Sequence, residues 1–334
     1  MKENCFKALR IFTKKEGEGY ESKIITRIID DLPKGDVLIR VKYSSLNYKD
    51  ALSASGNRGV TQYYPHTPGI DAAGMVVNSK NEKFEPKQNV ICTSYDLGMN
   101  TDGGFGQYIS VPAKWVIPLP KSLSLKESMQ LGTAGLTAGI GVHYLEESHL
   151  KKTDGRLLVT GATGGVGSLA VAILAKRGFT VTAATGKKEA QTDYLKSIGA
   201  HQVIHRDAVI DETERGLLSG KWAGVFDTTG GTILDTAIRQ TKHNGVIVCC
   251  GNASSHKLNT NVYPFILRGV RLLGIDSGNC SVKLRKRIWY KLADEYKPDH
   301  LDRISKPVTL HNLSSEIDRI LDGGQVGRKY VQLD

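Results

Sequence analysis

Apolar and polar residues alternate along the first third of the chain, as they do in half-buried β-strands. Residues 8–12 (ALRIF) and 36–45 (DVLIRVKYSS) show this alternation most clearly, and further short apolar runs follow up to about residue 120. Glycine and proline separate these runs. Because both residues favour turns, residues 1–120 are predicted to form a barrel-like antiparallel unit.

From about residue 124, helical patterns alternate with short, continuously apolar runs. Strands are predicted at 156–160, 180–185, 202–204, 223–227, 244–250 and 270–276, and helices between most of them. Strands joined in this way are typical of a doubly wound parallel sheet. A helix near 281–296, another near 312–321 and a last strand, RKYVQL, follow. The sequence therefore predicts an α/β protein in which a six-stranded parallel domain, 123–277, is inserted into a β-rich domain, 1–122 plus 278–334.

A glycine-rich turn, TGATGGVG, lies at residues 160–167, between the first of these strands and the next helix. From Gly165 the segment GVGSLA matches the pattern G-x-G-x-x-A. Glycines there let the chain turn tightly and bring backbone N–H groups at the helix start close to a pyrophosphate. An ordinary tight turn is the alternative, but strand, turn, helix and second strand have the spacing of a dinucleotide site.

The end of the second parallel strand indicates which dinucleotide binds. NAD sites place Asp or Glu there for the ribose 2′-hydroxyl, whereas this chain has Thr185, followed by Gly186, Lys187 and Lys188. A lysine could pair with the 2′-phosphate of NADPH. The alternative is that the lysines begin a solvated helix. We expect NADPH/NADP as the cofactor.

Composition and charge narrow the classes of function. The 334 residues include 45 Lys and Arg against 34 Asp and Glu, a net charge of +11. The densest basic segment, 283–292, has helical spacing, which favours a solvated helix face over a nucleic-acid site. No apolar run approaches the roughly 20 residues that cross a bilayer. The N-terminus lacks an apolar export segment, so we expect a cytoplasmic protein without a membrane partner.

Two common classes of dehydrogenase do not fit the sequence. Short-chain dehydrogenases need Tyr-x-x-x-Lys, and no tyrosine of this chain has a lysine four residues later. Zinc alcohol dehydrogenases need grouped Cys, His or carboxylate ligands, and no such group is recognisable. We therefore expect no metal. The five scattered cysteines predict reduced thiols rather than disulfides.

The β-rich start, the inserted domain and GATGGVG together resemble the medium-chain dehydrogenase/reductase superfamily, in its zinc-independent quinone oxidoreductase branch. Where zinc-dependent members have Gly-His-Glu, this chain has Gly69-Ile70-Asp71. Five longer segments are similar to the YhdH/YhfP family, which includes acrylyl-CoA reductases of the AcuI type. They are SSLNYKDAL (44–52), PGIDAAG (68–74), GTAGLTA (132–138), PFILRGVRLLGIDS (264–277) and VGRKYVQL (326–333). The resemblance implies a GroES-like catalytic domain, a Rossmann NADP-binding domain and a homodimer.

The resemblance also implies which residues bind the cofactor. Tyr48 would lie beside the nicotinamide, and Arg206 would cover the adenine end. The pyrophosphate would be held by Thr163, Gly164, Gly165 and Val166, and the 2′-phosphate by Thr185, Gly186 and Lys187. The nicotinamide side would be lined by Asn252, Ile266 and Ser277. The relatives have Ser-Gly-Arg where this chain has Thr-Gly-Lys, and lysine lacks the planar fork of arginine.

The reaction implied by the resemblance is hydride transfer from NADPH to the β-carbon of an α,β-unsaturated carbonyl, such as acrylyl-CoA or another enoyl-CoA, followed by protonation of the α-carbon. Negative charge forms on the carbonyl oxygen, and without a metal a hydrogen-bond donor must stabilise it. Asn47 and Tyr48 are the candidate catalytic residues. Asn47 could equally be a helix cap, and Tyr48 could simply pack against the ring.

Two other functions stay open. An NADPH:quinone oxidoreductase would transfer hydride in nearly the same way to a ring enone. Coenzyme A would need basic contacts, for which Arg58 and Arg268 are candidates, unless both are ordinary surface arginines. An NADPH-linked RNA-binding or sensor protein agrees with the positive charge, but no aromatic and basic stacking array supports it. The expected partner is a small-molecule substrate.

Overall fold

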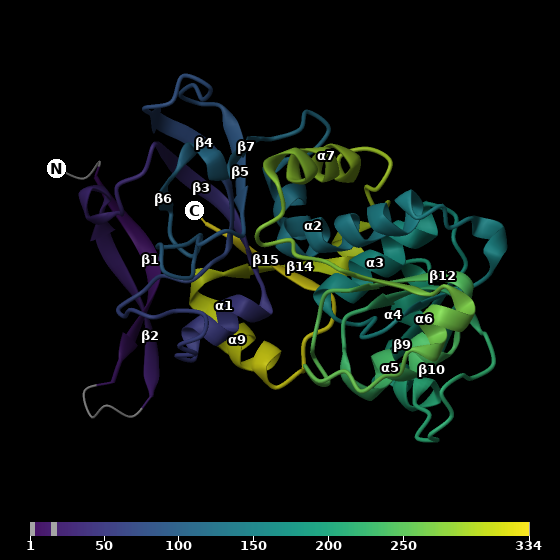
Figure 1. The fold of residues 1–334 in the computed structure, drawn as a ribbon. Coiled ribbons are helices and arrows are strands. Elements are labelled where there is room, and N and C mark those ends of the chain that lie inside the picture. The colour runs from purple at the N-terminus through teal and green to yellow at the C-terminus, as the bar shows by residue number, and fades with distance from the viewer. Residues whose placement is uncertain (1–3, 15–18, 334) are drawn as a thin grey trace. The chain divides into compact units, whose positions relative to one another are not determined.

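The computed structural model describes residues 4–14 and 19–333, which form two compact units (Figure 1). Unit 1 comprises Met1–Thr133, Gly278–Lys286 and Ser305–Asp334, and unit 2 comprises Ala134–Ser277 and Arg287–Ile304. Residues 1–3, 15–18 and 334 of the expected β-rich domain lie outside the described residues. The domain boundaries expected from the sequence stay a prediction.

Unit 1 consists mainly of β-strands. β1 (Cys5–Thr13) and β2 (Tyr20–Ile28) pair antiparallel as a separate two-stranded sheet. The larger sheet of the described residues has the order β14-β15-β3-β4-β5-β7, and β6 pairs with β3. Its strands are β3 (Val37–Leu46), β4 (Asp71–Ser79), β5 (Asn89–Thr93), β6 (Tyr108–Val111), β7 (Val116–Pro118), β14 (Ser305–Thr309) and β15 (Arg328–Gln332). All its pairings are antiparallel except that of β14 with β15.

The alternation in residues 36–45 corresponds to β3, which has one buried face. Val37, Ile39 and Val41 are buried, whereas the residues between them are not. These side chains belong to one apolar cluster that also includes Leu313 and Ile317 of α9 (Leu313–Leu321). α9 packs in turn against α1 (Tyr48–Ala54). The core of unit 1 therefore supports the turn at which α1 begins.

Unit 2 is organised around a parallel sheet. Among its described residues the sheet has the order β10-β9-β8-β11-β12-β13, and every pairing is parallel. The strands are β8 (Leu157–Val159), β9 (Val181–Thr185), β10 (Gln202–His205), β11 (Trp222–Asp227), β12 (Thr241–Cys249) and β13 (Arg271–Gly274). The predicted six-stranded doubly wound sheet is confirmed.

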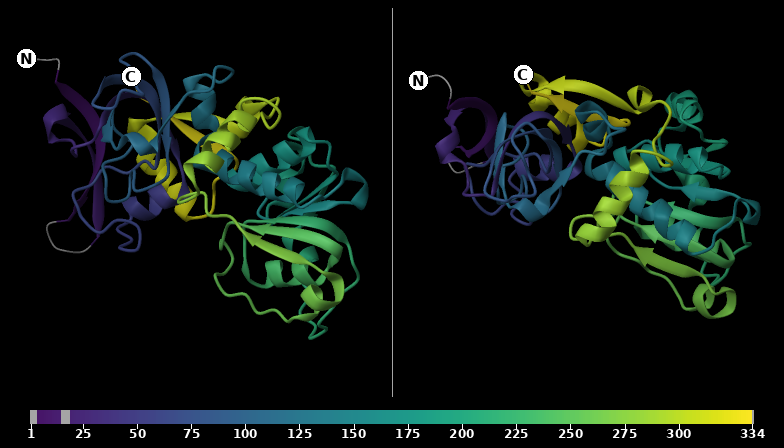
Figure 2. Two further views of the ribbon diagram at one scale, coloured as in Figure 1. Left: turned by 45° about the horizontal axis from the view of Figure 1, so that its top comes forward. Right: turned by 90° about the horizontal axis from the view of Figure 1, so that it is seen from above.

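Helices lie on both faces of this sheet (Figure 2). Those within unit 2 are α3 (Gly165–Lys176), α4 (Lys188–Ser197), α5 (Gly231–Arg239), α6 (Tyr263–Arg268) and α8 (Leu301–Ile304). Two further helices, α2 (Leu125–Glu147) and α7 (Val282–Leu292), have residues in both units. The chain builds outward from β8 to β10 and then returns to β11 beside β8, so the order reverses between β8 and β11. Ligands of open α/β sheets bind at the carboxyl ends of the strands beside such a reversal.

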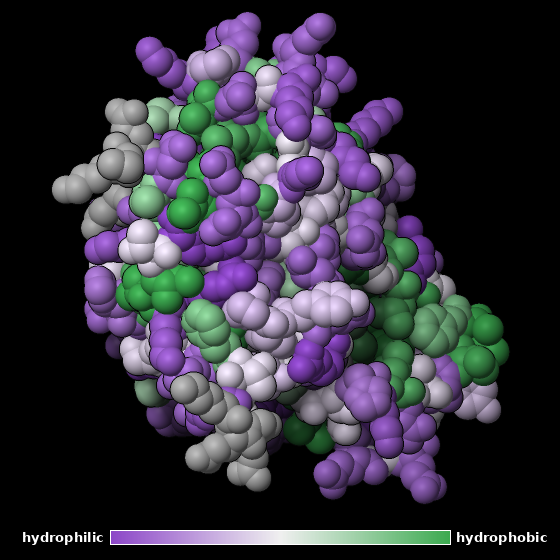
Figure 3. Space-filling view, turned by 90° about the vertical axis from the view of Figure 1, so that its left-hand side faces the viewer, coloured by the Kyte–Doolittle hydropathy of each residue, from purple (hydrophilic) through white to green (hydrophobic). Residues whose placement is uncertain are grey.

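The face of the molecule in Figure 3 is mostly hydrophilic, with hydrophobic side chains in small groups. Within the described residues, no helix combines the length and the apolar character that a membrane span requires.

Candidate functional site

The glycine-rich turn after β8 needs glycine at two positions for different reasons. Gly161 has a φ of +58°, and a Cβ there would lie 2.2 Å from the Oγ1 atom of Thr228. Gly167 lies in the first turn of α3, and a Cβ there would lie 2.3 Å from the carbonyl oxygen of Gly161. These approaches bring the start of α3 tightly against the end of β8.

The N-terminus of α3 points its backbone N–H groups out of this turn. Gly164 is the N-cap residue and supplies no side-chain cap, and Gly165 and Val166 follow as the first helical residues. The aligned peptide dipoles of a helix favour negative charge at this end. Thr163, Gly164, Gly165 and Val166 therefore lie together at the end of the helix that favours negative charge, and their role in binding a pyrophosphate stays a prediction.

A polar corner lies at the carboxyl end of β9, beside the glycine turn. The hydroxyl groups of Thr163 and Thr185 lie 3.0 Å apart, so the turn and the strand end are joined directly. The backbone N–H of Lys187 donates to the hydroxyl of Thr185 over 3.1 Å. Lys187 is the N-cap residue of α4. The structure thus places Lys187 at the strand end where the sequence analysis expected a 2′-phosphate.

Arg206 belongs to the same corner. β10 pairs with β9 so that His205 lies opposite Thr185, and Arg206 follows directly. A Cβ added at Gly186 would lie 3.2 Å from the Nε atom of Arg206, so the arginine side chain lies over this glycine. The Arg206 side chain is 64% exposed, and its 3.7 Å ion pair with Asp207 is exposed as well. Arg206 and Lys187 therefore provide two cations around Gly186.

Two of the three expected nicotinamide residues, Asn252 and Ser277, follow the carboxyl ends of β12 and β13. An open depression there is lined by Cys249, Cys250, Gly251, Asn252, Gly274, Ile275 and Asp276. Ser277 follows the depression directly, and its hydroxyl accepts a 2.7 Å hydrogen bond from Thr137. Ile266 does not line the depression: it lies on α6 and is 68% exposed. Asn252 thus lines the depression and Ser277 follows its last lining residue in the sequence, whereas Ile266 is outside the lining.

Asp227, at the end of β11, is a residue that the sequence analysis missed. Its buried carboxylate accepts hydrogen bonds from the hydroxyl of Thr160 (2.6 Å) and the N–H of Gly230 (2.8 Å). The thiol of Cys249 lies 3.6 Å from the same carboxylate. Burial, followed by the charge of Asp227, raises the pKa of Cys249 to about 11. An acidic residue ending an apolar run, directly before TTGG, was the available signal.

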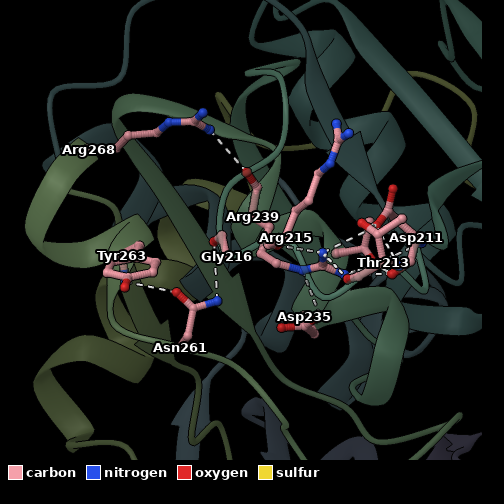
Figure 4. A network of polar contacts seen from close by, with 10 residues as sticks. Asp211, Thr213, Arg215, Gly216, Asp235, Arg239, Asn261, Tyr263 and Arg268 are labelled. Atoms are coloured by element: carbon pink, nitrogen blue, oxygen red, sulfur yellow. Dashed lines mark hydrogen bonds and ion pairs between the residues drawn. The ribbon is translucent and has the colours of Figure 1, made fainter.

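Arg268 is bound within the fold of unit 2 (Figure 4). Its guanidinium donates to the backbone carbonyls of Leu218 (2.6 Å), Arg239 (3.0 Å) and Thr241 (3.1 Å). Arg239 is the last residue of α5 and Thr241 is the first residue of β12, so Arg268 binds the junction of these two elements. Arg268 thereby fixes α6 and the segment around Leu218, which favours the ordinary structural role over contact with coenzyme A.

Asn47 and Tyr48 lie in unit 1, at the start of α1. Asn47 is the N-cap residue, and its backbone N–H donates to the carboxylate of Asp50 over 2.7 Å. Its side-chain oxygen accepts from Arg328 (2.9 Å) and its amide donates to Asp71 (2.9 Å). Tyr48 is 54% exposed, and within the described chain no hydrogen bond or ion pair engages its hydroxyl. The catalytic roles expected for both residues stay predictions. The side-chain amide of Asn47 already donates hydrogen bonds to Asp50 and Asp71 within the protein.

The donor groups at the Gly69-Ile70-Asp71 turn do not suit zinc. Ile70 is buried and aliphatic, and the Asp71 carboxylate accepts hydrogen bonds from Ser45, Asn47 and Thr133. A carboxylate satisfied in this way has no oxygen directed to a metal. Within residues 4–14 and 19–333, no three His, Cys, Asp or Glu side chains are grouped as metal ligands.

Two family models match the chain. The alcohol dehydrogenase GroES-like domain matches residues 33–121, and the zinc-binding dehydrogenase model matches residues 165–296. The expected GroES-like domain with a Rossmann sheet is confirmed.

Relatives match over nearly the whole chain. YhfP of Bacillus subtilis is 43% identical over 329 residues, which cover 98% of this chain and 99% of YhfP. The acrylyl-CoA reductase AcuI of Ruegeria pomeroyi is 40% identical over 329 residues, with the same coverage of both chains.

Solved structures agree with this relationship. The structure of B. subtilis YhfP with NAD bound matches with a TM-score of 0.96 and 42% identity, covering 99% of this chain and 100% of that one. The structure of YhdH from Salmonella enterica in complex with NADP matches with a TM-score of 0.94 and 36% identity, covering 98% and 100%. The chain therefore belongs to the medium-chain dehydrogenase/reductase superfamily and, within it, to the YhfP, YhdH and AcuI family of oxidoreductases.

Proposed function

We propose that this protein is an NADPH-dependent reductase that transfers a hydride to the activated double bond of an α,β-unsaturated thioester such as acrylyl-CoA. The proposal has two parts, a cofactor and a substrate class, and different observations support them.

The observation that supports NADPH most strongly is the corner formed by the ends of β9 and β10. Lys187 follows Gly186 directly, the Arg206 side chain lies over that glycine, and Thr185 stands where an NAD site would have a carboxylate. A 2′-phosphate there would gain charge-assisted hydrogen bonds from both cations. The complex of NADP with the Salmonella relative agrees with this assignment, and the complex of NAD with YhfP shows that the fold accepts either carrier.

The substrate class is supported by the likeness to AcuI, an acrylyl-CoA reductase 40% identical over nearly the whole of both chains. Bound NADPH supplies two electrons as a hydride. In the proposed reaction the hydride forms a bond to the β-carbon of the thioester, and the π electrons of the double bond move onto the carbonyl oxygen. A proton then adds at the α-carbon, which leaves a saturated thioester and NADP.

Tyr48 is the residue we propose to stabilise the developing oxyanion. Its hydroxyl is exposed and engaged by no described side chain, so it is free to donate to a substrate oxygen. A well-placed donor of this kind stabilises a transition state by about 3–4 kcal/mol. Asn47, whose amide is bound to Asp71 and Asp50, acts on the position of Tyr48 instead.

Quinone reduction is the second candidate function, because YhfP, 43% identical, is named a quinone oxidoreductase. The deciding experiment compares kcat/KM for acryloyl-CoA and for a benzoquinone, both with NADPH. We expect the larger value for acryloyl-CoA. Acryloyl-pantetheine, which keeps the thioester but lacks the nucleotide, serves as a control for recognition of the coenzyme A tail. A larger value for the quinone, with negligible turnover of the thioester, would overturn the proposed substrate class and favour quinone reduction.

A further inference from the structure

Three charged side chains lie buried together beneath the turn that begins α1. Asp50 and Asp71 have no exposed area, and Arg328 is 2% exposed. They come from α1, β4 and β15, which are far apart in the sequence. Burying such charges is costly unless each one is paired and hydrogen-bonded. The contacts of this charged cluster (Asp50, Asp71 and Arg328) therefore indicate what it stabilises.

Asp50 joins two turns of the backbone. One carboxylate oxygen accepts from the backbone N–H of Asn47 (2.7 Å) and from its side-chain amide (3.2 Å). The other accepts from the backbone N–H groups of Gly69 (3.1 Å) and Ile70 (2.7 Å). All four partners are donors, so an ionised carboxylate matches them and a group with its own hydrogen does not.

Asp71 and Arg328 bind the same turn, at residues 45–47. Asp71 accepts from the Ser45 hydroxyl (2.5 Å) and the Asn47 amide (2.9 Å). Arg328 donates to the carbonyl of Leu46 (3.0 Å), the side-chain oxygen of Asn47 (2.9 Å) and the Ser45 hydroxyl (2.8 Å). The side chains of both Ser45 and Asn47 are thus bound by members of the charged cluster.

The charge of the cluster is unbalanced, because two carboxylates face one guanidinium. Burial raises the pKa of Asp50 to about 7, and the negative charge of the neighbouring Asp71 is the second cause of this rise. Arg328, from β15, is the opposing cation, and both carboxylates act on it. We therefore expect Asp50 to change its protonation state close to neutral pH.

We propose that Asp50 is a positioning residue for the reductase reaction: by binding Asn47 through both its backbone and its side chain, it fixes the turn from which Tyr48 projects. Tyr48 follows Asn47 directly, and no contact among the described residues holds its hydroxyl, so its place depends on its own backbone. This inference rests on the proposed function, in which Tyr48 contacts the substrate.

The test is Asp50→Asn, which has nearly the same shape but replaces one oxygen by an NH₂ group. In either orientation of the new amide, its NH₂ group faces two N–H donors that the carboxylate oxygen had accepted from, so two of the four hydrogen bonds of Asp50 are lost. We expect kcat to fall by about ten- to a hundredfold, because small misplacements of a reacting group cost rates of this order. The KM of the substrate and the Kd of NADPH should change by less than about threefold, since transition-state alignment rather than binding is lost.

The pH profile separates positioning from simple stability. In the wild type, protonation of Asp50 places a hydrogen where a donor already points, so kcat should fall as the pH drops through about 7. The Asp50→Asn variant should lack this ionisation. Ser53→Ala is the matched control: Ser53 is buried on the same helix, and its hydroxyl pairs with Thr61 over 2.7 Å, outside the charged cluster. It should keep the wild-type kcat and pH profile.

Hydrogen exchange gives a readout that does not need activity. The amides of Asn47, Gly69 and Ile70 should exchange faster in Asp50→Asn than in the wild type or in Ser53→Ala. The inference would be overturned if Asp50→Asn kept both the kcat and the amide exchange rates of the wild type. It would also be overturned if Asp50→Asn and Ser53→Ala lost kcat equally. If Asp50→Asn does not fold, a flat wild-type kcat through neutral pH overturns it. A wild-type protein that reduces neither substrate class overturns the proposed function instead, and the exchange measurement still tests the inference.

Discussion

Lys187 and Arg206 would bind a phosphate in different ways. Lys187 is tied to the end of β9 through its own backbone N–H, whereas Arg206 extends over Gly186 from the neighbouring strand. Lysine supplies a point charge, and arginine a planar fork. Under the proposed function, Arg206 would present its planar fork to the 2′-phosphate from the end of β10.

Replacing Lys187 by Ala tests this corner. We expect the affinity for NADPH to fall by about 1–3 kcal/mol, the scale of a charge-assisted hydrogen bond, and the affinity for NADH to stay nearly constant. Calorimetric titration measures both. Lys188→Ala, which removes the neighbouring lysine in the first turn of α4, is the matched control and should leave the ratio of the two affinities unchanged. Equal losses for NADPH and NADH in Lys187→Ala would refute the assignment.

Tyr48→Phe removes only the hydroxyl proposed to meet the substrate oxygen. If the hydroxyl acts in the transition state, kcat should fall by about a hundred- to a thousandfold with little change in KM. Tyr63→Phe is the control, since Tyr63 is also in unit 1 and is 74% exposed. An unchanged kcat in Tyr48→Phe would reduce Tyr48 to a packing role.

Single residues were predictable where local pattern decides their place. Thr185 and Lys187 follow an apolar run, and Gly161 to Gly167 precede a helical stripe, so spacing alone placed them at strand and helix ends. Asp50 and Arg328 were not predictable, because the atoms that they bind are brought together only by the fold: Arg328 contacts Asn47 from 281 positions away. Ile266 shows the opposite case, since an aliphatic residue before a strand would ordinarily be buried and here is exposed.

At the scale of elements, α2 shows how the charged cluster depends on backbone shape. α2 is interrupted at Gly132, which has φ +54° and ψ −156°, a conformation nearly confined to glycine. A Cβ there would lie 2.4 Å from the Ser45 hydroxyl and 2.6 Å from the Asp71 carboxylate. The interruption also directs the N–H of Thr133 to Asp71 over 2.9 Å. The GTAGLTA segment thus has a structural reason to contain glycine at its first position.

Gly132→Ala should destabilise the protein by about 3 kcal/mol or more, since backbone strain and overpacking add. Gly323→Ala is the control, because Gly323 also has a positive φ, +67°, but a Cβ there would meet nothing within 4 Å. It should cost only about 1–2 kcal/mol. Urea unfolding followed by circular dichroism measures both, and equal costs would show that the close approach to Asp71 has no energetic consequence.

The elements themselves followed the sequence pattern closely. The six parallel strands and α9 lie where periodicity predicts them, and β15 spans the RKYVQL segment. β14 and α6 were not predicted, because each is short: β14 spans Ser305–Thr309 and α6 spans Tyr263–Arg268. Such lengths leave too few residues for a period of two or 3.6 to emerge, and tertiary pairing decides. β14 forms by pairing with β15.

At the scale of the whole molecule, the proposed function needs both units. The cofactor corner and the depression belong to unit 2, whereas Tyr48 and the charged cluster belong to unit 1. The sequence pattern predicts one β-rich part and one part in which strands and helices alternate, and the domain boundaries expected from it stay a prediction. The homodimer and the cytoplasmic location stay predictions. Sedimentation velocity would test the homodimer, for which we expect about twice the 36.4 kDa of one chain.

The most direct test of the proposed reaction follows the transferred hydrogen. The enzyme is incubated with acryloyl-CoA and NADPH that is deuterated at the hydride-donating position, and the thioester product is analysed by mass spectrometry and NMR. We predict a saturated propionyl thioester with one deuterium at its β-carbon. Recovery of unreacted acryloyl-CoA, or a saturated product without deuterium at that carbon, would contradict the account.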